Sequence, residues 1–325
     1  MTKRILTGIK PTGTIHIGNY FGAIAPMLRA QAANDAEVYL FLANLHAFTA
    51  LHNPQEIREH SYTALKTYIA CGIDPKKTCI YTPADIPAHT ELGRILGCIT
   101  NMGTMERMHA YKDAVAKGKA NEISVGVFSY PILMAADILL YDATNVPVGK
   151  DQKQHVEYAR DIAEKFNRTF GETFVLPEPT IDASVATVPG IDGRKMSKSY
   201  NNHITLLDDE KTLLKKIKLI STDTKSVEEP KDPDTCNVYN ITKLFLTEEE
   251  NNVLRKRYTD GGLGYKEAKD ILFEKLRAFL QPIQTRFNEI TDADIQAILK
   301  AGSEKVKPIA DKKIQEVKEK IGFIL

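Results

Sequence analysis

Hydrophobic and polar positions follow two different patterns along the chain. Up to about residue 170, short apolar runs rich in β-branched residues alternate with longer segments whose apolar residues recur at helical spacing. These runs predict strands at residues 4–9, 37–50, 77–85 and 144–149, with helices between them. The alternation of strands and helices predicts a Rossmann-like, doubly wound parallel sheet with helices on both faces.

The pattern changes after Tyr200. Segments such as "DDEKTLLKKIKLIS" and "YKEAKDILFEKLRAF" are amphipathic and charged, and they carry almost no strand signal. We therefore expect an α/β domain over residues 1–200 and an all-helical domain over 201–325, with a loop at 225–237. The last helix, from about residue 310, has two possible positions: within the helical domain, or packed back on residues 1–200.

Composition narrows the class of protein without naming its partner. The formal net charge is +1, so no global field points to a polyanion, although a local basic face would be enough to bind one. The four cysteines lie far apart and form no CxxC pair, which argues against a zinc site or a disulfide framework. No apolar run approaches 18 residues. We expect a cytoplasmic protein that does not enter a membrane.

The stretch "PTGTIHIGNY" at residues 11–20 joins the first strand to a helix. Free N–H groups and the dipole at a helix start favour an anion there. Gly18 would allow a phosphate to approach the backbone, and His16 and Asn19 can donate hydrogen bonds to it. The alternative is a purely structural turn, and this stretch alone does not decide between the two.

The stretch "GIDGRKMSKSYNN" places Arg194, Lys195 and Lys198 beside hydroxyls and glycines. Lysines on a flexible loop can stabilise the charge that grows on a leaving pyrophosphate, and such a loop can close over its ligand. The alternative is a solvated basic loop, which composition alone favours.

Taken together, "HIGN" and "KMSKS" resemble the paired signatures of class I aminoacyl-tRNA synthetases, whose usual forms are His-x-Gly-His and Lys-Met-Ser-Lys-Ser. The second motif is intact, and Asn19 in the first is typical of the tryptophan-specific branch. Residues 129–167 and several of the later helical segments also resemble bacterial tryptophanyl-tRNA synthetases. The resemblance extends over essentially the whole chain.

The resemblance implies an ATP-dependent ligase. Such an enzyme activates L-tryptophan to tryptophanyl-adenylate with release of pyrophosphate, and then transfers tryptophan to tRNA(Trp). It implies a homodimer with a helical dimerisation segment at about 85–140, and an anticodon-binding role for 201–325. ATP and Mg²⁺ are the expected cofactors, with Mg²⁺ held mainly by the ATP phosphates rather than by a protein metal site.

The nearest relatives of the tryptophan enzymes are specific for tyrosine. Asp137 lies seven residues after Tyr130, so the two share a helix face. A buried carboxylate accepts equally from an indole N–H or a phenol O–H, so Asp137 alone does not discriminate. Met134 is more informative, because the tyrosine family usually has a glutamine there and a methionine suits the face of a large ring. This difference favours tryptophan.

The remaining site residues follow from the resemblance, position by position. Those implied in catalysis are His16, Asn19, Lys195, Ser197 and Lys198. Those implied in ATP binding are Lys10, Pro11, Thr12, Gly18, Asn19, Gly149, Lys150, Asp151, Val185, Lys195, Met196, Ser197, Lys198 and Ser199. Those implied in tryptophan binding are Leu6, His46, Tyr130, Met134, Asp137, Val146, Val148 and Gln152. His46 could equally be a core histidine on a strand. Lys10 and Lys150 replace the glutamine and glutamate of many relatives, and both changes add positive charge.

Three other functions compete with this one. The first is a tyrosine-specific synthetase, which Met134 disfavours. The second is a regulatory protein that binds tryptophan or RNA without charging tRNA, which has no use for an intact "KMSKS" loop. The third is a small-molecule nucleotidyltransferase, which would not need about 125 further helical residues.

Overall fold

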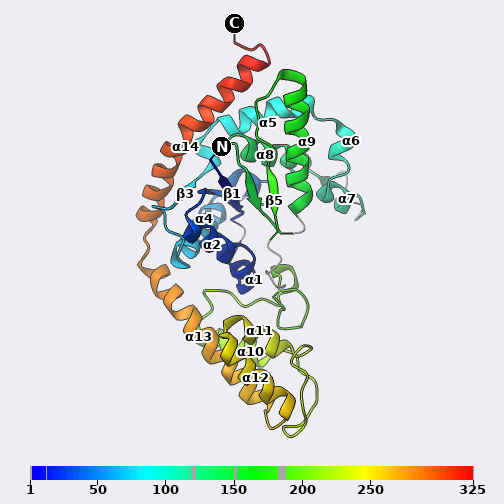
Figure 1. Ribbon diagram of the computed structural model, residues 1–325, viewed down its shortest axis with the longest axis vertical. Helices are drawn as coiled ribbons and strands as arrows, with labels where there is room; N and C mark the ends of the chain where they lie inside the picture. Colours follow the sequence, from blue (N-terminus) through cyan, green and yellow to red (C-terminus); the bar gives the residue numbers. More distant parts are fainter. Residues whose placement is uncertain are drawn as a thin grey trace. The chain divides into compact units, whose positions relative to one another are not determined.

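The computed structural model describes residues 2–11, 13–116, 118, 122–149, 152–181 and 188–324. Its central feature is a five-stranded, fully parallel sheet in the order β3-β2-β1-β4-β5 (Figure 1). The strands are β1 (Arg4–Ile9), β2 (Glu37–Leu42), β3 (Thr78–Tyr81), β4 (Asn145–Pro147) and β5 (Glu178–Thr180). The strand order reverses between β1 and β4, where ligands of open α/β sheets bind beyond the carboxyl ends of the strands. The expected doubly wound fold is confirmed.

The centre of the sheet is tightly packed. β1 and β2 pair along their whole length, from Arg4 opposite Glu37 to Ile9 opposite Leu42. A Cβ atom on Gly8 would lie 2.5 Å from the ring of Phe41, so only glycine fits at that position.

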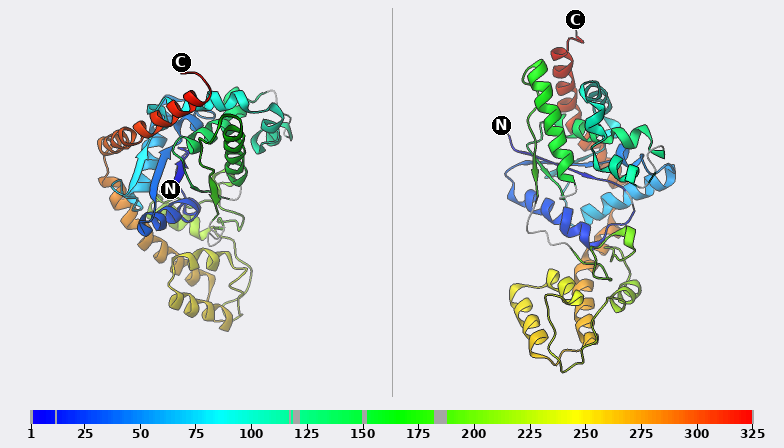
Figure 2. Two further views of the ribbon diagram at one scale, coloured as in Figure 1. Left: turned by 45° about the horizontal axis from the view of Figure 1, so that its top comes forward. Right: turned by 90° about the vertical axis from the view of Figure 1, so that its right-hand side faces the viewer.

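Helices cover both faces of the sheet, as expected. In the right-hand view of Figure 2, α2 (Ala25–Ala33) and α4 (Pro54–Ala70) lie on one side of the strands, and α5 (Ala88–Ile99), α8 (Val125–Leu139) and α9 (Lys153–Phe170) lie on the other. The start of α4 follows from its sequence, because Asn53 accepts from the backbone N–H groups of Gln55 and Glu56 and proline occupies the first helical position. The shorter α6 (Met102–Met105) and α7 (His109–Ala116) lie between α5 and α8 in the chain.

Three strand predictions differ from the structure. The strand expected at 77–85 ends at Tyr81, and Pro83–Asp85 form the short 3-10 helix η2. Residues 37–50 do not form one strand, since β2 ends at Leu42 and α3 (Asn44–Ala47) follows it. The apolar pattern continues through α3 because both elements are packed inside, and periodicity does not separate two short buried elements. β5 was not predicted, because its sequence Glu-Pro-Thr has no apolar run; it forms by pairing with β4 at the edge of the sheet.

The chain divides into two compact units that interleave in sequence. Unit 1 comprises Met1–Gly13, Pro26–Ala183 and Thr291–Leu325, and unit 2 comprises Thr14–Ala25 and Ser184–Ile290. The expected cut at residue 200 does not coincide with these boundaries. The turn around His16 and the loop around Lys195 belong to unit 2 together with most of the helical segment.

Unit 2 joins the start of the first helix to a helical bundle. Its elements are α1 (Ile17–Asn19), the π-helix η1 (Tyr20–Ile24), η5 (Lys198–Tyr200), α10 (Glu210–Lys218), α11 (Asn237–Thr242), η6 (Lys243–Phe245), α12 (Glu248–Asp260) and α13 (Tyr265–Glu289). Tyr20 packs edge-on against Phe279, and Phe21 against Phe245, at centroid distances of 4.8 and 5.5 Å. These rings fix η1 against α13 and η6.

The last helix, α14 (Asp292–Lys320), belongs to unit 1 and packs against β3 and α5 (Figure 1). Its backbone approaches the sheet so closely that a Cβ atom on Gly302 would lie 1.8 Å from the carbonyl oxygen of Ile80. Buried Lys313 donates to the Thr173 carbonyl oxygen at 2.8 Å and pairs with Asp142 at 3.0 Å. Of the two positions left open for the last helix, the structure shows the one packed on the α/β unit. No helix of the described residues is long and apolar enough to span a membrane.

Candidate active site

His16 caps the helix that follows it. Its Nδ1 accepts from the backbone N–H of Asn19 at 3.3 Å, and the Asn19 Oδ1 accepts from the backbone N–H of His16 at 3.1 Å, which forms a reciprocal capping box. Because Nδ1 is an acceptor, the proton of the neutral ring lies on Nε2. The cap therefore presets His16 as a hydrogen-bond donor.

The two sequence motifs lie together in unit 2. The Ile17 N–H donates to the Ile204 carbonyl at 3.0 Å, and the Leu206 N–H donates to the Ile15 carbonyl at 2.9 Å. A Cβ atom on Gly18 would lie 3.0 Å from the His16 ring and 3.6 Å from the Cβ of Met196. The HIGN turn is thus paired with residues 204–206, shortly after the KMSKS motif, and Gly18 lies close to Met196.

The surroundings of His16 disfavour a positive charge on it. Burial, together with nearby His203, Lys198 and Lys195, lowers the pKa of His16 to about 4. Partial burial of the amine also lowers the pKa of Lys198, although the residue as a whole is exposed. The His203 ring lies 5.8 Å from that of His16, and sequence analysis did not select it. Two neutral imidazoles therefore lie beside two lysines, and a bound anion would stabilise the positive charge of the lysines.

The lowered pKa of His16 predicts a pH dependence of stability. The unfolded chain binds a proton at an ordinary pKa of 6.5 and the folded chain only near 4, so folding loses stability as pH falls through this window. The difference in free energy of unfolding between the wild type and His16→Asn, which keeps a capping side chain, should shrink by about 2 kcal/mol between pH 7 and pH 5. Urea titrations measure it. His109→Gln, which alters an exposed imidazole, should show no such trend; a pH-independent His16→Asn difference would contradict the prediction.

The KMSKS loop is fixed by one buried side chain, Asn202, which is 2% exposed. Its Oδ1 accepts from the Ser197 N–H at 2.8 Å, and its Nδ2 donates to the Asp192 carboxylate at 2.7 Å and to the Lys195 carbonyl at 3.2 Å. The Ser197 hydroxyl oxygen accepts from the Ser199 N–H at 3.3 Å. Met196 is buried, whereas Lys195 and Lys198 are exposed. The loop thus presents its lysines from an anchored base.

Replacing Asn202 with alanine should loosen this base. We expect the rate of ATP–pyrophosphate exchange to fall by about 10- to 100-fold, because a displacement of about 1 Å in a charge-stabilising group has an effect of this size. The KM for the amino acid should stay within about threefold, because the residues implied in binding it lie in unit 1 and the loop lies in unit 2. Asn201→Gly is the matched control, because Asn201 is exposed and has φ +50°, which glycine adopts freely. Equal effects of both variants would exclude an anchoring role.

A second cluster of polar side chains lies in unit 1 around Asp137, which is 1% exposed. Its Oδ2 lies 2.8 Å from Nε2 of His46, and its Oδ1 lies 2.5 Å from Nδ1 of His89. Burial raises the pKa of Asp137, but the hydrogen bonds and charges of His46 and His89 outweigh it, so the net pKa lies below the ordinary value. The carboxylate is therefore ionised and doubly hydrogen-bonded.

Apolar side chains surround this carboxylate. Leu6 and Val146 are buried in the same core cluster against which Met134 and Val148 pack. The Tyr130 ring lies 6.1 Å from that of His46, and its hydroxyl is 2.7 Å from Nε2 of His155. Of the eight residues expected to bind tryptophan, His46, Tyr130 and Asp137 are joined by contacts, and Leu6, Met134, Val146 and Val148 share this apolar cluster. His46 is on α3 rather than on a strand.

The remaining predicted residues differ in how far the structure places them. Lys10 and Pro11 directly follow β1, Gly149 follows β4, and Gln152 directly precedes α9. Burial lowers the pKa of the Lys10 amine. The predicted residues that lie outside the described part of the chain are Thr12, Lys150, Asp151 and Val185.

Comparison with known proteins decides the family. Residues 2–281 match the family model described as tRNA synthetases class I (W and Y). The chain belongs to this family of class I tRNA synthetases. It is 46% identical to a tryptophan–tRNA ligase of Campylobacter jejuni, over 98% of this chain and 100% of that one, and 44% identical to one of Neisseria meningitidis, over 99% and 98%.

Solved structures agree. A crystal structure of tryptophanyl-tRNA synthetase from Campylobacter jejuni, complexed with ADP and tryptophan, superimposes with a TM-score of 0.91 at 46% identity, covering 98% of this chain and 99% of that one. The family resemblance stated from the sequence and the enzyme class, an aminoacyl-tRNA synthetase, are confirmed.

In this class I synthetase, polar residues that sequence analysis did not select also lie around the predicted site residues. They are His89, Tyr141, His155, Asn202 and His203. Only the position of Asn202 and His203, directly after "KMSKSY", could have drawn attention to them. Nothing local marks His89, which lies 48 residues before its partner Asp137.

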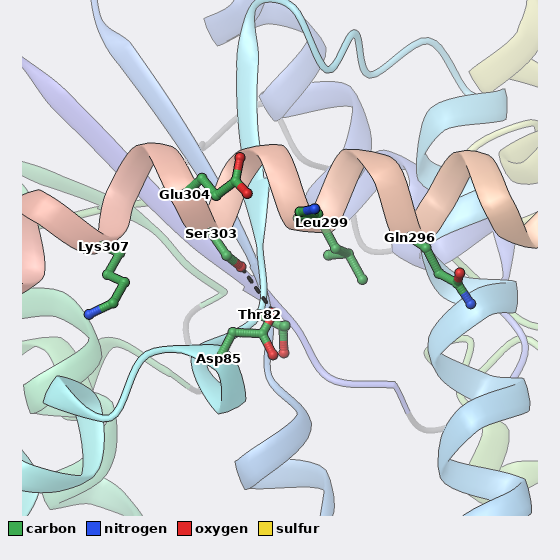
Figure 3. A pocket seen from close by; sticks show the side chains of 8 residues that line it. Thr82, Asp85, Gln296, Leu299, Ser303, Glu304 and Lys307 are labelled. Atoms are coloured by element: carbon green, nitrogen blue, oxygen red, sulfur yellow. Dashed lines mark hydrogen bonds between the residues drawn. The ribbon is translucent and has the colours of Figure 1, made fainter.

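One further hollow lies on α14 in unit 1 (Figure 3). It measures about 420 Å³ and runs between α14 and the connection from β3 to α5, where the Ser303 hydroxyl donates to Asp85 at 3.2 Å. Its lining residues are Thr82, Asp85, Gln296, Leu299, Lys300, Ser303, Glu304 and Lys307. Among the residues that the structure describes, neither this hollow nor any other place gathers three histidine, cysteine or carboxylate side chains that could hold a metal ion.

Proposed function

We propose that this synthetase is a tryptophan–tRNA ligase, which activates L-tryptophan with ATP to tryptophanyl-adenylate and pyrophosphate and then transfers tryptophan to tRNA(Trp). The observation that carries the proposal is the pairing of the HIGN turn with the KMSKS segment in one compact unit. The full-length similarity to tryptophan–tRNA ligases supports the choice of amino acid.

Tryptophan recognition is assigned to the cluster around Asp137. The buried carboxylate accepts the indole N–H, since an ionised Asp has acceptors only. Leu6, Met134, Val146 and Val148 pack against the rings, and His46 borders them. Phenylalanine has no such donor and would leave the buried carboxylate oxygen without its hydrogen bond, so the site should reject phenylalanine strongly. Tyr130 and Gln152 bind the amino or carboxylate group.

Tyrosine is the main competing substrate. Its hydroxyl would also satisfy Asp137, so the discrimination is assigned to Met134. This side chain is partly buried and packs against the apolar core cluster. A methionine there is apolar and adaptable, and it fits the larger indole face.

The phosphates of ATP are assigned to unit 2. His16 donates from Nε2, Asn19 from its side-chain amide, and Gly18 leaves room for a close approach to the backbone. Lys195 and Lys198 stabilise the negative charge that develops on the leaving pyrophosphate. The tryptophan carboxylate is the nucleophile, so the protein contributes orientation and charge stabilisation and no covalent intermediate.

Mg²⁺ fits this assignment as an ion held mainly by the ATP phosphates. The residues assigned to the phosphates are lysines and neutral donors rather than carboxylates, so the phosphates themselves would hold the ion. When bound, Mg²⁺ neutralises phosphate charge.

The remaining proposals concern partners and location. A homodimer is supported by exposed apolar side chains within 85–140, namely Met102, Val115 and Val125, which are 64%, 48% and 82% exposed. Residues 201–290 are proposed to read the anticodon, and their exposed lysines are available to RNA phosphates. Arg255 and Arg257, in contrast, pair with Asp234 and Glu267. A cytoplasmic location is proposed from the family.

Aminoacylation tests the proposed function. The purified enzyme, ATP, Mg²⁺ and radiolabelled tryptophan should charge tRNA(Trp) transcripts and leave tRNA(Tyr) transcripts uncharged. Charging of tRNA(Tyr) with tyrosine would assign the protein to the other branch of the family. Binding of tryptophan without charging of either tRNA would support the regulatory alternative.

Lys10 gives a more local test. We expect Lys10→Gln to raise the KM for ATP or for tryptophan by about 3- to 10-fold. Burial lowers the pKa of the Lys10 amine, and a bound anion beside the amine would stabilise its positive charge. Steady-state exchange kinetics measure both constants. Lys3→Gln, which removes only an exposed pair with Asp35, should leave them unchanged. Unchanged constants in Lys10→Gln would rule out contact with either ligand.

A further inference from the structure

His89 is the most completely enclosed histidine around the Asp137 cluster. It stands on the first turn of α5 and is 0% exposed. Its Nδ1 lies 2.5 Å from Oδ1 of Asp137, and its Nε2 lies 2.7 Å from the hydroxyl of Tyr141, itself fully buried. Both ring nitrogens are therefore occupied. His89 has no nitrogen left for a substrate, so any role in the reaction must act through Asp137.

The hydrogen bonds of this cluster have a defined direction. An ionised carboxylate only accepts, so the Nδ1 of His89 carries a proton and donates it to Asp137. With Nδ1 as the donor, Nε2 is the nitrogen that accepts from the Tyr141 hydroxyl. Burial raises the pKa of Tyr141 well above its ordinary range, which keeps that hydroxyl protonated. Tyr141 thus donates to His89, and His89 donates to Asp137.

This order fixes how the carboxylate faces the candidate pocket. Oδ1 is held by His89, and Oδ2 is directed to His46, whose side chain is 12% exposed. A carboxylate oxygen has two lone pairs, so Oδ2 can accept from His46 and from one further donor. Without His89, the carboxylate would lose its second donor in a fully buried site and could rotate.

On these contacts, and resting on the proposed function, we propose that His89, backed by Tyr141, is a positioning residue that holds Oδ2 of Asp137 as the acceptor for the indole N–H. It sets specificity without touching the amino acid. Its effect is therefore confined to substrates that carry a ring donor.

A substrate analogue without that donor separates positioning from simple structural support. In 3-benzothienyl-L-alanine a sulfur atom replaces the indole N–H, while ring size is nearly kept. We expect His89→Leu to lower kcat/KM for tryptophan in ATP–pyrophosphate exchange by at least tenfold and that for the analogue by less than threefold. His89→Asn, whose amide can replace the Nδ1–H donor, should recover most of the tryptophan activity.

Two further variants keep the test interpretable. Ser303→Ala removes the hydrogen bond to Asp85 on the connection that leads to α5 (Figure 3), so it perturbs the same segment without touching Asp137. In this variant the ratio of kcat/KM for tryptophan to kcat/KM for the analogue should stay at the wild-type value. Tyr141→Phe should reduce this kcat/KM ratio by about two- to fivefold. It serves as the test variant if His89→Leu does not fold.

The outcomes are distinct. A substrate ratio that stays at the wild-type value in His89→Leu and Tyr141→Phe, with both substrates losing activity equally, would overturn the positioning role. Failure of the wild type to use tryptophan at all would instead overturn the proposed function.

Discussion

Replacing Asp137 with asparagine should lower kcat/KM for tryptophan by roughly 10²–10³-fold. Both carboxylate oxygens accept hydrogen bonds, whereas the asparagine amide must turn its NH₂ group, itself a donor, toward one of the groups that donate to the carboxylate. In the folded protein both oxygens accept, one from His46 and one from His89, and His89 is fully buried. The same mismatch should cost about 1–3 kcal/mol of the free energy of unfolding.

The measurement combines exchange kinetics with urea unfolding. Asp85→Asn is the matched control, because Asp85 is an exposed acid of the same unit that accepts a hydrogen bond from the Ser303 hydroxyl. It should keep activity and stability within the experimental error. An Asp137→Asn enzyme with wild-type kcat/KM for tryptophan would show that the carboxylate does not recognise the substrate.

Replacing Lys198 with alanine should lower kcat for tryptophan activation by roughly 10²–10³-fold, the usual effect of removing one group that stabilises a developing negative charge. Lys198 is exposed on a loop that Asn202 anchors, and its charge influences His16, so it belongs to the electrostatic surroundings of the HIGN turn. The KM for tryptophan should change little, since the lysine acts on the phosphates.

Single-turnover formation of the adenylate measures this effect without interference from product release. Lys211→Ala removes an exposed lysine at the start of α10 and should leave the rate unchanged. Lys198→Arg keeps the positive charge and should retain a measurable part of the wild-type rate. A normal single-turnover rate in Lys198→Ala would remove this lysine from the mechanism.

The sequence was sufficient to predict four of the five strands and the two signature motifs. β1 is a short run rich in β-branched and aliphatic residues that ends in a turn. "HIGN" and "KMSKS" each bring their chemistry together within a few consecutive residues. Contiguous chemistry of this kind is visible to motif analysis because it does not depend on the rest of the fold.

What could not be predicted depends on residues far apart in the chain. His89 and Asp137 meet because α5 packs on α8, and no local pattern encodes that contact. The position of α14 depends on Gly302, whose missing Cβ allows the helix to touch β3, yet a glycine inside an amphipathic helix signals only a local weakness in propensity. Domain boundaries failed to follow composition for the same reason, since contacts rather than sequence order define the two units.

The central claim, activation of tryptophan at a class I site, is tested most directly by ATP–pyrophosphate exchange without tRNA, with each of the twenty amino acids supplied in turn. Exchange should be stimulated by tryptophan alone. Stimulation by tyrosine, or by none of the twenty, would contradict it.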